Sequence, residues 1–380
     1  MESFDVAIVG AGIAGASLGY RVADLCSVLL LERESQPGYH ATGRSAAMFM
    51  ESYGPPVVRA LTRASRAFYE SPPPGFCDVP LLAPRGALYV ATREQAALLE
   101  RTRAELEATG SRVELLDAAG ALALAPCLRR EDLSGALYER DAQDIDVAAL
   151  HQGFLRGFKS RGGQLRTSAA LRDARRGAPA WRLTLADGNE VHARAVVNAA
   201  GAWADEVATL LGADPLGLQP RRRSAFTFRP HEGSDTARWP AVVGIDESWY
   251  FKPDAGQLLG SPANADDTHA HDVLPEELDI ATGISRIEAA TTLSIRRPTA
   301  TWAGLRTFSP DGEIVIGWDA SVDGLFWLAG QGGYGIQSAA GAAELAAALL
   351  LMEALPQELD RSGVNPAAVS PGRFQPTVRR

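Results

Sequence analysis

Apolar residues at the start of the chain group into runs of strand length on either side of a glycine-rich turn. Residues 4–9 form the first run, which ends at Gly10-Ala11-Gly12-Ile13-Ala14-Gly15. An apolar, alanine-rich segment of helical character follows, and a second apolar run over residues 27–31 stops at Glu32. This order predicts a strand, a tight turn, a helix and a second strand that ends in an acid.

The glycines of this turn follow the G-x-G-x-x-G pattern, in which each one has a mechanical role. Gly10 allows the sharp turn, Gly12 lets the backbone approach a pyrophosphate, and Gly15 lets the helix lie close to the strand. The helix start presents N–H groups and a partial positive charge to the phosphates, and Glu32 can accept hydrogen bonds from a ribose. The stretch predicts a dinucleotide site; an ordinary strand–helix–strand unit with a glycine-rich turn is the alternative.

Strand–helix units recur in the middle and at the end of the chain, with short strands between them. We expect helices over residues 94–109, 148–161, 281–291 and 336–354 and from Ala204 onward, and strands over 86–92, 135–139, 164–167, 181–185, 191–200, 223–228, 241–245, 249–252, 257–260 and 324–329. The short strands between residues 220 and 260 predict an antiparallel sheet, and residues 297–317 read as irregular. The fold class is therefore α/β, with a doubly wound nucleotide domain built from three separated segments and a second domain that covers it.

Composition narrows the function classes. The 380 residues are enough for two domains, and the net charge of −9 argues against a nucleic-acid partner. The three cysteines form no C-x-x-C pair, which argues against a disulfide framework and fits a reducing, cytoplasmic location. We see no signal peptide and no membrane-span pattern. His269 and His271 lie in an acidic, irregular stretch without a third ligand nearby, so we expect a solvated loop and no metal site.

A second glycine-rich turn near the C-terminus indicates which dinucleotide is bound. Residues 328–336 read L-A-G-Q-G-G-Y-G-I, between an expected strand and an expected helix. A flavin enzyme uses such a unit, because a helix N-terminus stabilises the negative charge of the reduced flavin at its N1–C2=O edge. Gly332, Gly333 and Gly335 would allow the backbone to approach the flat ring. The alternative is a glycine-rich connection in the sheet.

Several motifs together resemble the D-amino acid oxidase superfamily of flavoproteins. They are the first glycine turn with Glu32-Arg33, then Gly43-Arg44-Ser45, the N-A-A-G-A-W run over residues 198–203, W-A-G-L-R over 302–306, and Pro310-Asp311-Gly312 with Gly317. Within that superfamily the chain is most similar to the bacterial FAD-dependent D-arginine dehydrogenases, over residues 36–47, 217–226, 246–254, 259–266 and 330–337.

The resemblance implies a Rossmann-like FAD-binding domain of the glutathione-reductase type with an inserted α+β substrate domain that carries an antiparallel sheet. Residues 1–50, 142–217 and 300–380 would form the FAD-binding domain, and residues 51–141 and 218–299 the substrate-binding domain. The FAD would be non-covalent, because the flavin-facing residues 44–48 include no His or Cys. The implied cofactor-binding residues are Gly10, Gly12, Ile13, Ala14, Gly15, Glu32, Arg33, Thr42, Gly43, Arg44, Ser45, Ala46, Ala200, Gly201, Trp203, Gly332, Gly333, Tyr334, Gly335, Ile336 and Gln337.

The resemblance also implies a carboxylate-binding site, formed by Arg223, Tyr250, Arg306 and Tyr53, while the carbonyl of Gly304 would accept from the substrate amine. The chemistry agrees, since a guanidinium fork matches a carboxylate with two parallel hydrogen bonds and a tyrosine hydroxyl adds another donor. Residues 221–223 are all arginine and could otherwise be a solvated charged turn. Strand alternation turns neighbouring arginines to opposite faces, so one of them can point into a site.

The expected side-chain pocket departs from the resembled enzymes. Ala87 takes the place of a glutamate that pairs with the guanidinium in D-arginine dehydrogenases, and Met48 and Met50 replace their histidine and threonine. The lining would then be apolar: Met48, Met50, Ala87, Ala241 and Val243. Two methionines could also be core filler.

These expectations combine into one function hypothesis. It is FAD-dependent oxidative deamination of small-molecule D-amino acids with uncharged, apolar side chains, in which a hydride passes from Cα to flavin N5 and the imine is hydrolysed to a 2-oxo acid and ammonia. The electron acceptor stays open between dioxygen, a quinone and a dye. One alternative is a flavoenzyme of the same fold that oxidises N-alkyl glycines or 2-hydroxy acids, and another is a non-catalytic flavin-binding protein.

Overall fold

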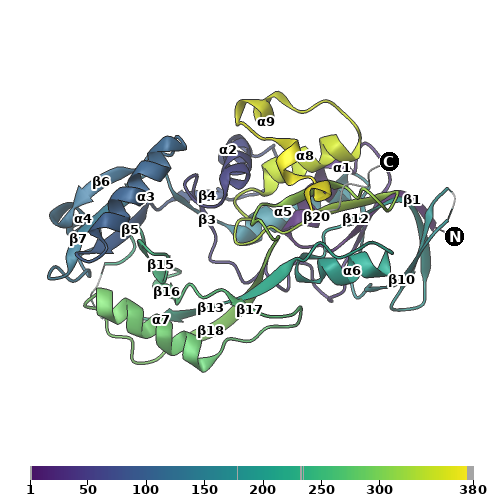
Figure 1. The fold of residues 1–380 in the computed structure, drawn as a ribbon. Coiled ribbons are helices and arrows are strands. Elements are labelled where there is room, and N and C mark those ends of the chain that lie inside the picture. The colour runs from purple at the N-terminus through teal and green to yellow at the C-terminus, as the bar shows by residue number, and fades with distance from the viewer. Residues whose placement is uncertain (1, 178, 232, 234, 375–380) are drawn as a thin grey trace.

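Three separated segments of the chain build the first of two large sheets (Figure 1). The computed structural model describes residues 2–177, 179–231, 233 and 235–374. The first sheet has eight strands: β1 (Glu2–Val9), β2 (Val28–Leu31), β9 (Gln164–Arg166), β10 (Leu171–Arg176), β11 (Trp181–Leu185), β12 (Glu190–Asn198), β19 (Val315–Trp318) and β20 (Leu325–Ala329). Its central strands, in the order β9-β2-β1-β12-β20, all run parallel, so their carboxyl ends meet at one edge.

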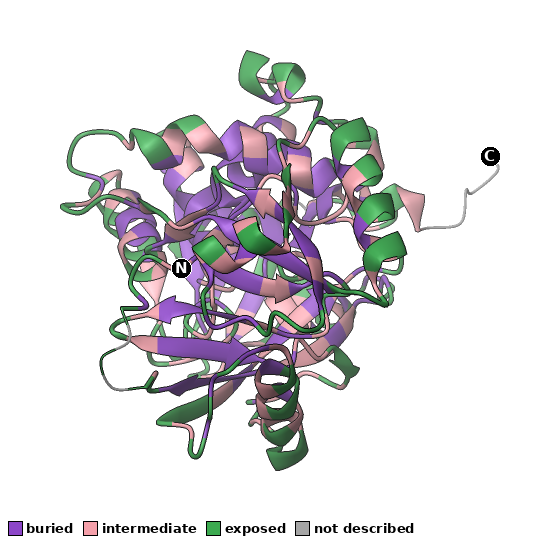
Figure 2. Cartoon of the chain, turned by 90° about the vertical axis from the view of Figure 1, so that its left-hand side faces the viewer, coloured by how far each residue is buried: buried purple, intermediate pink, exposed green. Residues whose placement is uncertain are grey.

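Helices cover both faces of this sheet, which explains why its central strands are apolar on both sides. One face carries α1 (Ile13–Val22), α5 (Val147–Ser160) and α8 (Ala339–Leu350), and α2 (Pro56–Glu70) packs on α8. The other face packs against α6 (Ala204–Leu210), which contacts β10 and β12 of the sheet. Two short segments complete this half, the 3-10 turn Gly201–Trp203 and α9 (Gln357–Arg361). Figure 2 shows the buried residues gathered along the strands and the inner sides of the helices.

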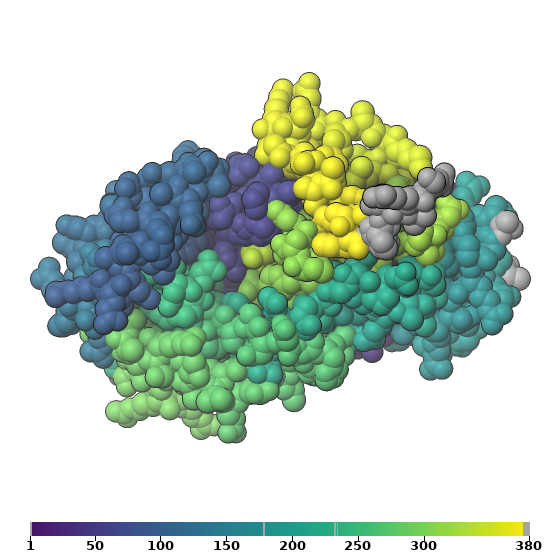
Figure 3. Space-filling model, in the orientation of Figure 1, coloured from purple at the N-terminus to yellow at the C-terminus, as the bar shows by residue number. Residues whose placement is uncertain are grey.

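The second sheet has nine strands: β5 (Ala87–Thr92), β6 (Glu114–Asp117), β7 (Leu133–Glu139), β13 (Gln219–Phe228), β14 (Ala241–Gly244), β15 (Tyr250–Asp254), β16 (Gln257–Ser261), β17 (Asp266–Asp267) and β18 (Ala300–Phe308). Neighbouring strands run antiparallel except β14 and β5, which are parallel. That pair joins two distant segments, which lie side by side in the space-filling view as the blue and green parts (Figure 3). The associated helices are α3 (Ala96–Ala108), α4 (Ala118–Leu124) and α7 (Glu277–Ala290).

Alternation along these strands separates a packed core from a functional face. Phe226, Val242 and Phe251 point into one core, together with Ile287 of α7. The residues next to them in sequence, among them Val243, point to the opposite face. A small third sheet consists of β3 (Met48–Phe49), β8 (Gln143–Ile145) and β4 (Leu82–Pro84). Its strands belong to segments of the chain that connect the two large sheets.

Most expected helices and strands of the chain are confirmed within a few residues, and several expectations are wrong. Residues 297–317, expected to be irregular, contain β18 and the start of β19. β18 pairs with β13 in the nine-stranded sheet, although it follows the expected domain boundary at residue 300. The helix expected over 336–354 is α8 (Ala339–Leu350). It begins later than expected because residues 333–338 form successive turns. The strands between residues 220 and 260 pair antiparallel with one another, as expected, and the same sheet also contains the parallel pair of β14 and β5, which the sequence did not indicate.

Helix α2 had no counterpart in the sequence analysis, and it packs with the helices of the first sheet. Among the described residues, no helix is long and apolar enough to cross a membrane.

Candidate active site

A cavity of about 410 Å³ lies at the carboxyl ends of the parallel strands, between the two large sheets. The ends of β1, β2 and β12 contribute Val9, Leu31 and Ala199, and the second sheet contributes residues from β13, β14, β15 and β18. Open α/β sheets bind ligands at this edge, because loops and helix starts converge there. The geometry therefore brings the predicted dinucleotide elements and the predicted substrate residues to one cavity.

The first glycine turn is built as the G-x-G-x-x-G pattern requires. Gly10 has a φ of +106°, and a Cβ there would lie 2.4 Å from the carbonyl oxygen of Ala199. A Cβ on Gly15 would lie 1.9 Å from the carbonyl oxygen of Gly10, so only glycine lets α1 pack this closely on the turn. Behind the turn, the buried His151 of α5 lies 2.9 Å from the carbonyl oxygen of Ala11 through Nε2. His151 is a supporting residue that the sequence analysis missed.

Glu32 ends β2 as a buried carboxylate directed at this turn. Its Oε2 accepts the N–H of Ala11 at 3.1 Å, and its Oε1 accepts the N–H of Glu34 at 2.9 Å. Burial raises the pKa of Glu32, while these two backbone donors lower it. Each oxygen keeps a further lone pair, so the side chain can still accept from ribose hydroxyls.

Only part of the helix start is free for phosphates, because the N–H of Ile13 donates to the Thr42 hydroxyl at 3.0 Å. The sequence analysis expected these N–H groups to be unpaired. Gly12 leaves the backbone accessible, since a Cβ there would meet only the Thr42 oxygen, at 3.2 Å. The turn therefore fits a pyrophosphate through its backbone and a ribose through Glu32.

The second glycine turn closes on the cavity near the substrate residues. The N–H of Gly332 donates to the carbonyl of Thr307 in β18 at 2.8 Å. A Cβ on Gly333 would lie 1.2 Å from Nη2 of Arg306, so any other residue here would displace the guanidinium from its place at the cavity. We expected Gly333 to serve the approach to a flat ring, and the structure adds this second requirement.

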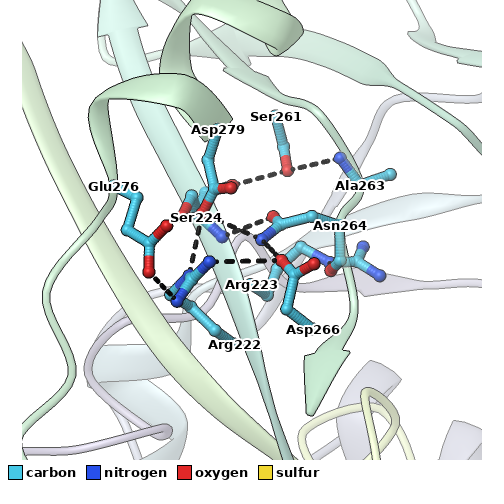
Figure 4. Close-up of polar contacts among 9 residues, drawn as sticks. All are labelled: Arg222, Arg223, Ser224, Ser261, Ala263, Asn264, Asp266, Glu276 and Asp279. Carbon is cyan, nitrogen blue, oxygen red and sulfur yellow. Dashed lines mark hydrogen bonds and ion pairs between the residues drawn. The ribbon is translucent and has the colours of Figure 1, made fainter. Parts of the chain in front are cut away.

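Two neighbouring arginines of β13, Arg222 and Arg223, point in different directions, as strand alternation predicts (Figure 4). Arg222 turns away from the cavity and binds Asp279 at 2.8 Å, Asp266 at 3.4 Å and Glu276. Arg223 lines the cavity, and its Nε donates to the carbonyl of Asn264 at 2.5 Å. Burial and the nearby cation of Arg306 lower the pKa of Arg223. Two half-buried cations at one cavity favour an anionic ligand.

The other predicted carboxylate-binding residues line the same cavity. Nη2 of Arg306 donates to the Tyr53 hydroxyl at 2.8 Å. The Tyr53 ring packs edge to face on Tyr334, with centroids 5.0 Å apart. Tyr250, from β15, and Gly304, opposite Arg223 in the pairing of β13 and β18, also line the cavity. All five residues predicted to hold the substrate carboxylate and amine, residues 53, 223, 250, 304 and 306, are thus brought together.

The predicted side-chain pocket is less apolar than expected. Met48, Met50, Ala241 and Val243 line the cavity, whereas Ala87 is fully buried behind it.

The lining residues that the sequence analysis missed include Tyr89, Glu247 and Lys252. Lys252 is only 6% exposed, and its Nζ binds Asp144 at 2.7 Å. Asp144 also binds Arg85 at 2.6 Å, so two cations share one carboxylate. Strand alternation from Tyr250 was the signal that could have placed Lys252 on this face.

Most predicted cofactor-binding residues line the cavity, and three do not. Gly15 and Gly43 lie within tight backbone packing, and Tyr334 lies behind Tyr53. The predicted cofactor-binding residues that line the cavity are Gly10, Gly12, Ile13, Ala14, Glu32, Arg33, Thr42, Arg44, Ser45, Ala46, Ala200, Gly201, Trp203, Gly332, Gly333, Gly335, Ile336 and Gln337. Cavity residues near them that the sequence analysis missed are Tyr39, His40, Ala169, Ala170, Leu171, Glu206, Val207 and Leu210.

The side chain of Arg44 is bound to protein groups. Its guanidinium donates to the carbonyls of Tyr39, Val273 and Ala303 at 3.3, 3.0 and 3.1 Å and pairs with Asp272. Arg44 therefore fastens the segment around residue 272 to β18. His269 and His271 in that segment stack with centroids 4.4 Å apart. No group of three or more His, Cys, Asp or Glu within the described residues could hold a metal ion.

The site combines a glycine turn at the end of β1, an acid directly after β2, and a cavity that two arginines of the second sheet, Arg223 and Arg306, also line. These features are typical of the dinucleotide-dependent enzymes. The chain belongs to the DAO family of FAD dependent oxidoreductases, whose family model matches residues 5–349. FAD is therefore its cofactor.

Curated relatives and solved structures agree with this family over nearly the whole chain. The chain is 24% identical to FAD-dependent oxidoreductase domain-containing protein 1 of Bos taurus, covering 92% of this chain and 82% of that protein. It is 25% identical to glycine oxidase of Bacillus licheniformis, and the match covers 92% of this chain and 94% of that protein. The structure of glycine oxidase from Geobacillus kaustophilus superposes with a TM-score of 0.81 at 24% identity. The superposition covers 93% of this chain and 96% of that one.

Proposed function

We propose that this protein oxidises D-amino acids to imines, which water hydrolyses to 2-oxo acids and ammonia. The observation that carries the proposal is the convergence of Arg223 and Arg306, with Tyr53 and Tyr250, on the cavity. FAD, when bound, supplies the two-electron acceptor for the hydride that leaves Cα. The residues of the first glycine turn, Glu32 and the turn over residues 332–337 would hold it without a covalent bond.

The residues of the chain bind and orient the substrate. A carboxylate between Arg223 and Arg306 would offset two half-buried cations and accept charge-assisted hydrogen bonds from both. The Tyr53 hydroxyl, which already accepts from Arg306, can donate its own proton to the carboxylate. The carbonyl of Gly304 can accept from the substrate amine, which must be neutral for its lone pair to assist. Fixing both groups orients the Cα–H bond.

Side-chain selectivity follows from the lining. Met48, Met50 and Val243 offer apolar surface, and burial of a substrate side chain gains roughly 25 cal/mol per Å². A cationic side chain finds no carboxylate at residue 87 and meets the ammonium of Lys252. Glu247 lines the cavity too, but it is exposed, so solvent screens its charge. We therefore propose that uncharged apolar side chains are preferred over cationic ones.

A second candidate function is oxidation of glycine or N-alkyl glycines, which the glycine oxidase relatives favour. The same carboxylate site would serve such substrates, and it would also serve 2-hydroxy acids. The D stereochemistry rests on the resemblance to D-arginine dehydrogenases.

Anaerobic flavin reduction tests these proposals directly. The panel contains D- and L-amino acids, glycine, N-methylglycine and 2-hydroxy acids, and the flavin absorbance is followed without any acceptor. We expect D-Leu, D-Met and D-Phe to bleach the flavin fastest. Faster reduction by N-methylglycine or a 2-hydroxy acid would select the alternative, and no reduction by any compound would indicate a non-catalytic flavin-binding protein. Reoxidation by dioxygen, a quinone and a dye then identifies the acceptor class.

A further inference from the structure

A buried carboxylate that the proposed chemistry does not use lies just behind the cavity. Glu139 ends β7, directly opposite Ala87 of β5, and it is 5% exposed. It does not line the cavity. Burying a carboxylate is costly unless hydrogen-bond donors compensate for the lost water, so its partners indicate what it does.

Among the described residues, the hydrogen-bond donors to the Glu139 carboxylate all belong to one turn. Its Oε1 accepts the N–H of Glu51 at 2.9 Å and that of Ser52 at 3.4 Å, and its Oε2 contacts the Ser52 hydroxyl. The Ser52 oxygen also lies 3.4 Å from the hydroxyl of Tyr89, which lines the cavity. Burial raises the pKa of Glu139, and the three donors lower it. The carboxylate therefore ties the turn over residues 50–54 to the nine-stranded sheet.

The same turn carries two residues of the site, Met50 and Tyr53. On its other side, Nε2 of Gln337 donates to the carbonyl of Tyr53 at 3.1 Å, and Nε of Arg59 donates to the carbonyl of Gly54 at 2.5 Å. Glu139 supplies acceptors for the N–H groups at the start of the turn, whereas Gln337 and Arg59 supply donors for carbonyls at its end. The turn is thus held between the two halves of the molecule.

We propose that Glu139 is a positioning residue that holds the turn over residues 50–54, so that the Tyr53 hydroxyl meets Arg306 and the substrate carboxylate. The inference rests on the proposed function, because it assigns Tyr53 to carboxylate binding. Without the Glu139 carboxylate, two backbone N–H groups and a hydroxyl lose their acceptor. The turn can then shift, and a displacement of about 1 Å takes the Tyr53 hydroxyl beyond hydrogen-bond distance of the carboxylate.

Three variants of the full-length holoenzyme test the role of Glu139. Glu139→Ala removes all acceptors, and Glu139→Gln keeps an oxygen for the N–H groups. Asp319→Ala is the matched control, because Asp319 is also buried and its Oδ1 accepts two backbone N–H groups and a serine hydroxyl, but it lies outside the cavity. We measure the melting temperature, flavin content, kcat, KM and the dissociation constant of pyruvate, titrated by the flavin spectrum without turnover.

We expect Glu139→Ala to raise KM and the pyruvate dissociation constant by about tenfold or more with flavin content unchanged. Glu139→Gln should recover to within about threefold of wild type, since its oxygen still accepts the N–H groups. Asp319→Ala should lower the melting temperature and leave both constants unchanged. Equal pyruvate binding by wild type and Glu139→Ala would overturn the inference, as would an equal effect of Asp319→Ala.

A double-mutant cycle with Tyr53→Phe separates this inference from the proposed function. If Glu139 acts through Tyr53, the double variant should bind pyruvate only slightly worse than Tyr53→Phe alone. Effects that multiply would show that Glu139 does not act through Tyr53. If Tyr53→Phe weakens binding and Glu139→Ala does not, only the inference fails. If Tyr53→Phe binds pyruvate as wild type does, the assignment of the carboxylate site fails, and the inference fails with it.

Discussion

Replacing Arg223 by methionine should separate substrate binding from stability. Arg223 lines the cavity, and its Nε already donates to the carbonyl of Asn264, so its terminal nitrogens remain for the proposed carboxylate fork. Methionine keeps much of the apolar stem and removes the charge and the donors. The loss of one charge-assisted, bidentate contact is worth roughly 2–4 kcal/mol. At about 1.36 kcal/mol per factor of ten, kcat/KM should fall by roughly 30- to 1,000-fold.

The stability of the Arg223→Met variant should move differently from its activity. The pKa of Arg223 is lowered by burial and by Arg306, which means that folding disfavours its charged form. At any pH below that lowered pKa, the charge therefore reduces the stability of the folded protein. A neutral side chain removes this penalty, so the melting temperature should stay the same or rise.

A neighbouring arginine provides the matched control. Arg221 lies two residues earlier on β13, its side chain is 39% exposed, and it pairs with Asp267 at 2.8 Å. Because exposed pairs contribute little, Arg221→Met should leave flavin reduction by D-Leu and flavin content unchanged. Both variants are compared by anaerobic stopped-flow reduction over a range of substrate concentrations. Near-normal kcat/KM in Arg223→Met, or an equal loss in Arg221→Met, would refute the assignment of the carboxylate anchor.

Three further outcomes follow from the same site. Denaturing the yellow protein and filtering it should release the flavin, and flavin that stays with the polypeptide would contradict non-covalent binding. If the reactive amine must be neutral, kcat/KM should rise to a plateau between about pH 6 and about pH 10; a flat profile would remove that step. D-Leu, D-Met and D-Phe should exceed D-Arg and D-Lys in kcat/KM by about tenfold or more, and Lys252→Met should narrow the gap; a wild-type preference for D-Arg would contradict the proposed selectivity.

Local features of the chain were sufficient to predict the strand–turn–helix units. The apolar run of β1 and the spacing of Gly10 and Gly15 encode a short-range geometry. A Cβ at either glycine would clash with a backbone carbonyl of the same unit or of the neighbouring strand. Alternation along β13 likewise separated Arg222 from Arg223, since the period of a strand is fixed by its backbone.

Predictions failed where a strand depends on a distant partner. β18 has Gly304 in its middle and looked irregular, yet it pairs with β13 over nine registered positions. The parallel pairing of β14 with β5 joins segments that lie 154 residues apart in the chain, and nothing local specifies its direction. Propensity is a weak guide in such cases, because the pairing partner provides the stabilising hydrogen bonds.

The sequence by itself determined the dinucleotide turn, the acid after β2 and which residue types could bind a carboxylate. Only the tertiary structure decided that Lys252 enters the cavity, that Ala87 lies behind it, and that Glu139 holds the turn that carries Tyr53. The physical reason is that the first set of features depends on backbone geometry over a few residues. The second set depends on which side chains from distant strands share one face, and that is fixed only when the sheets pair and pack.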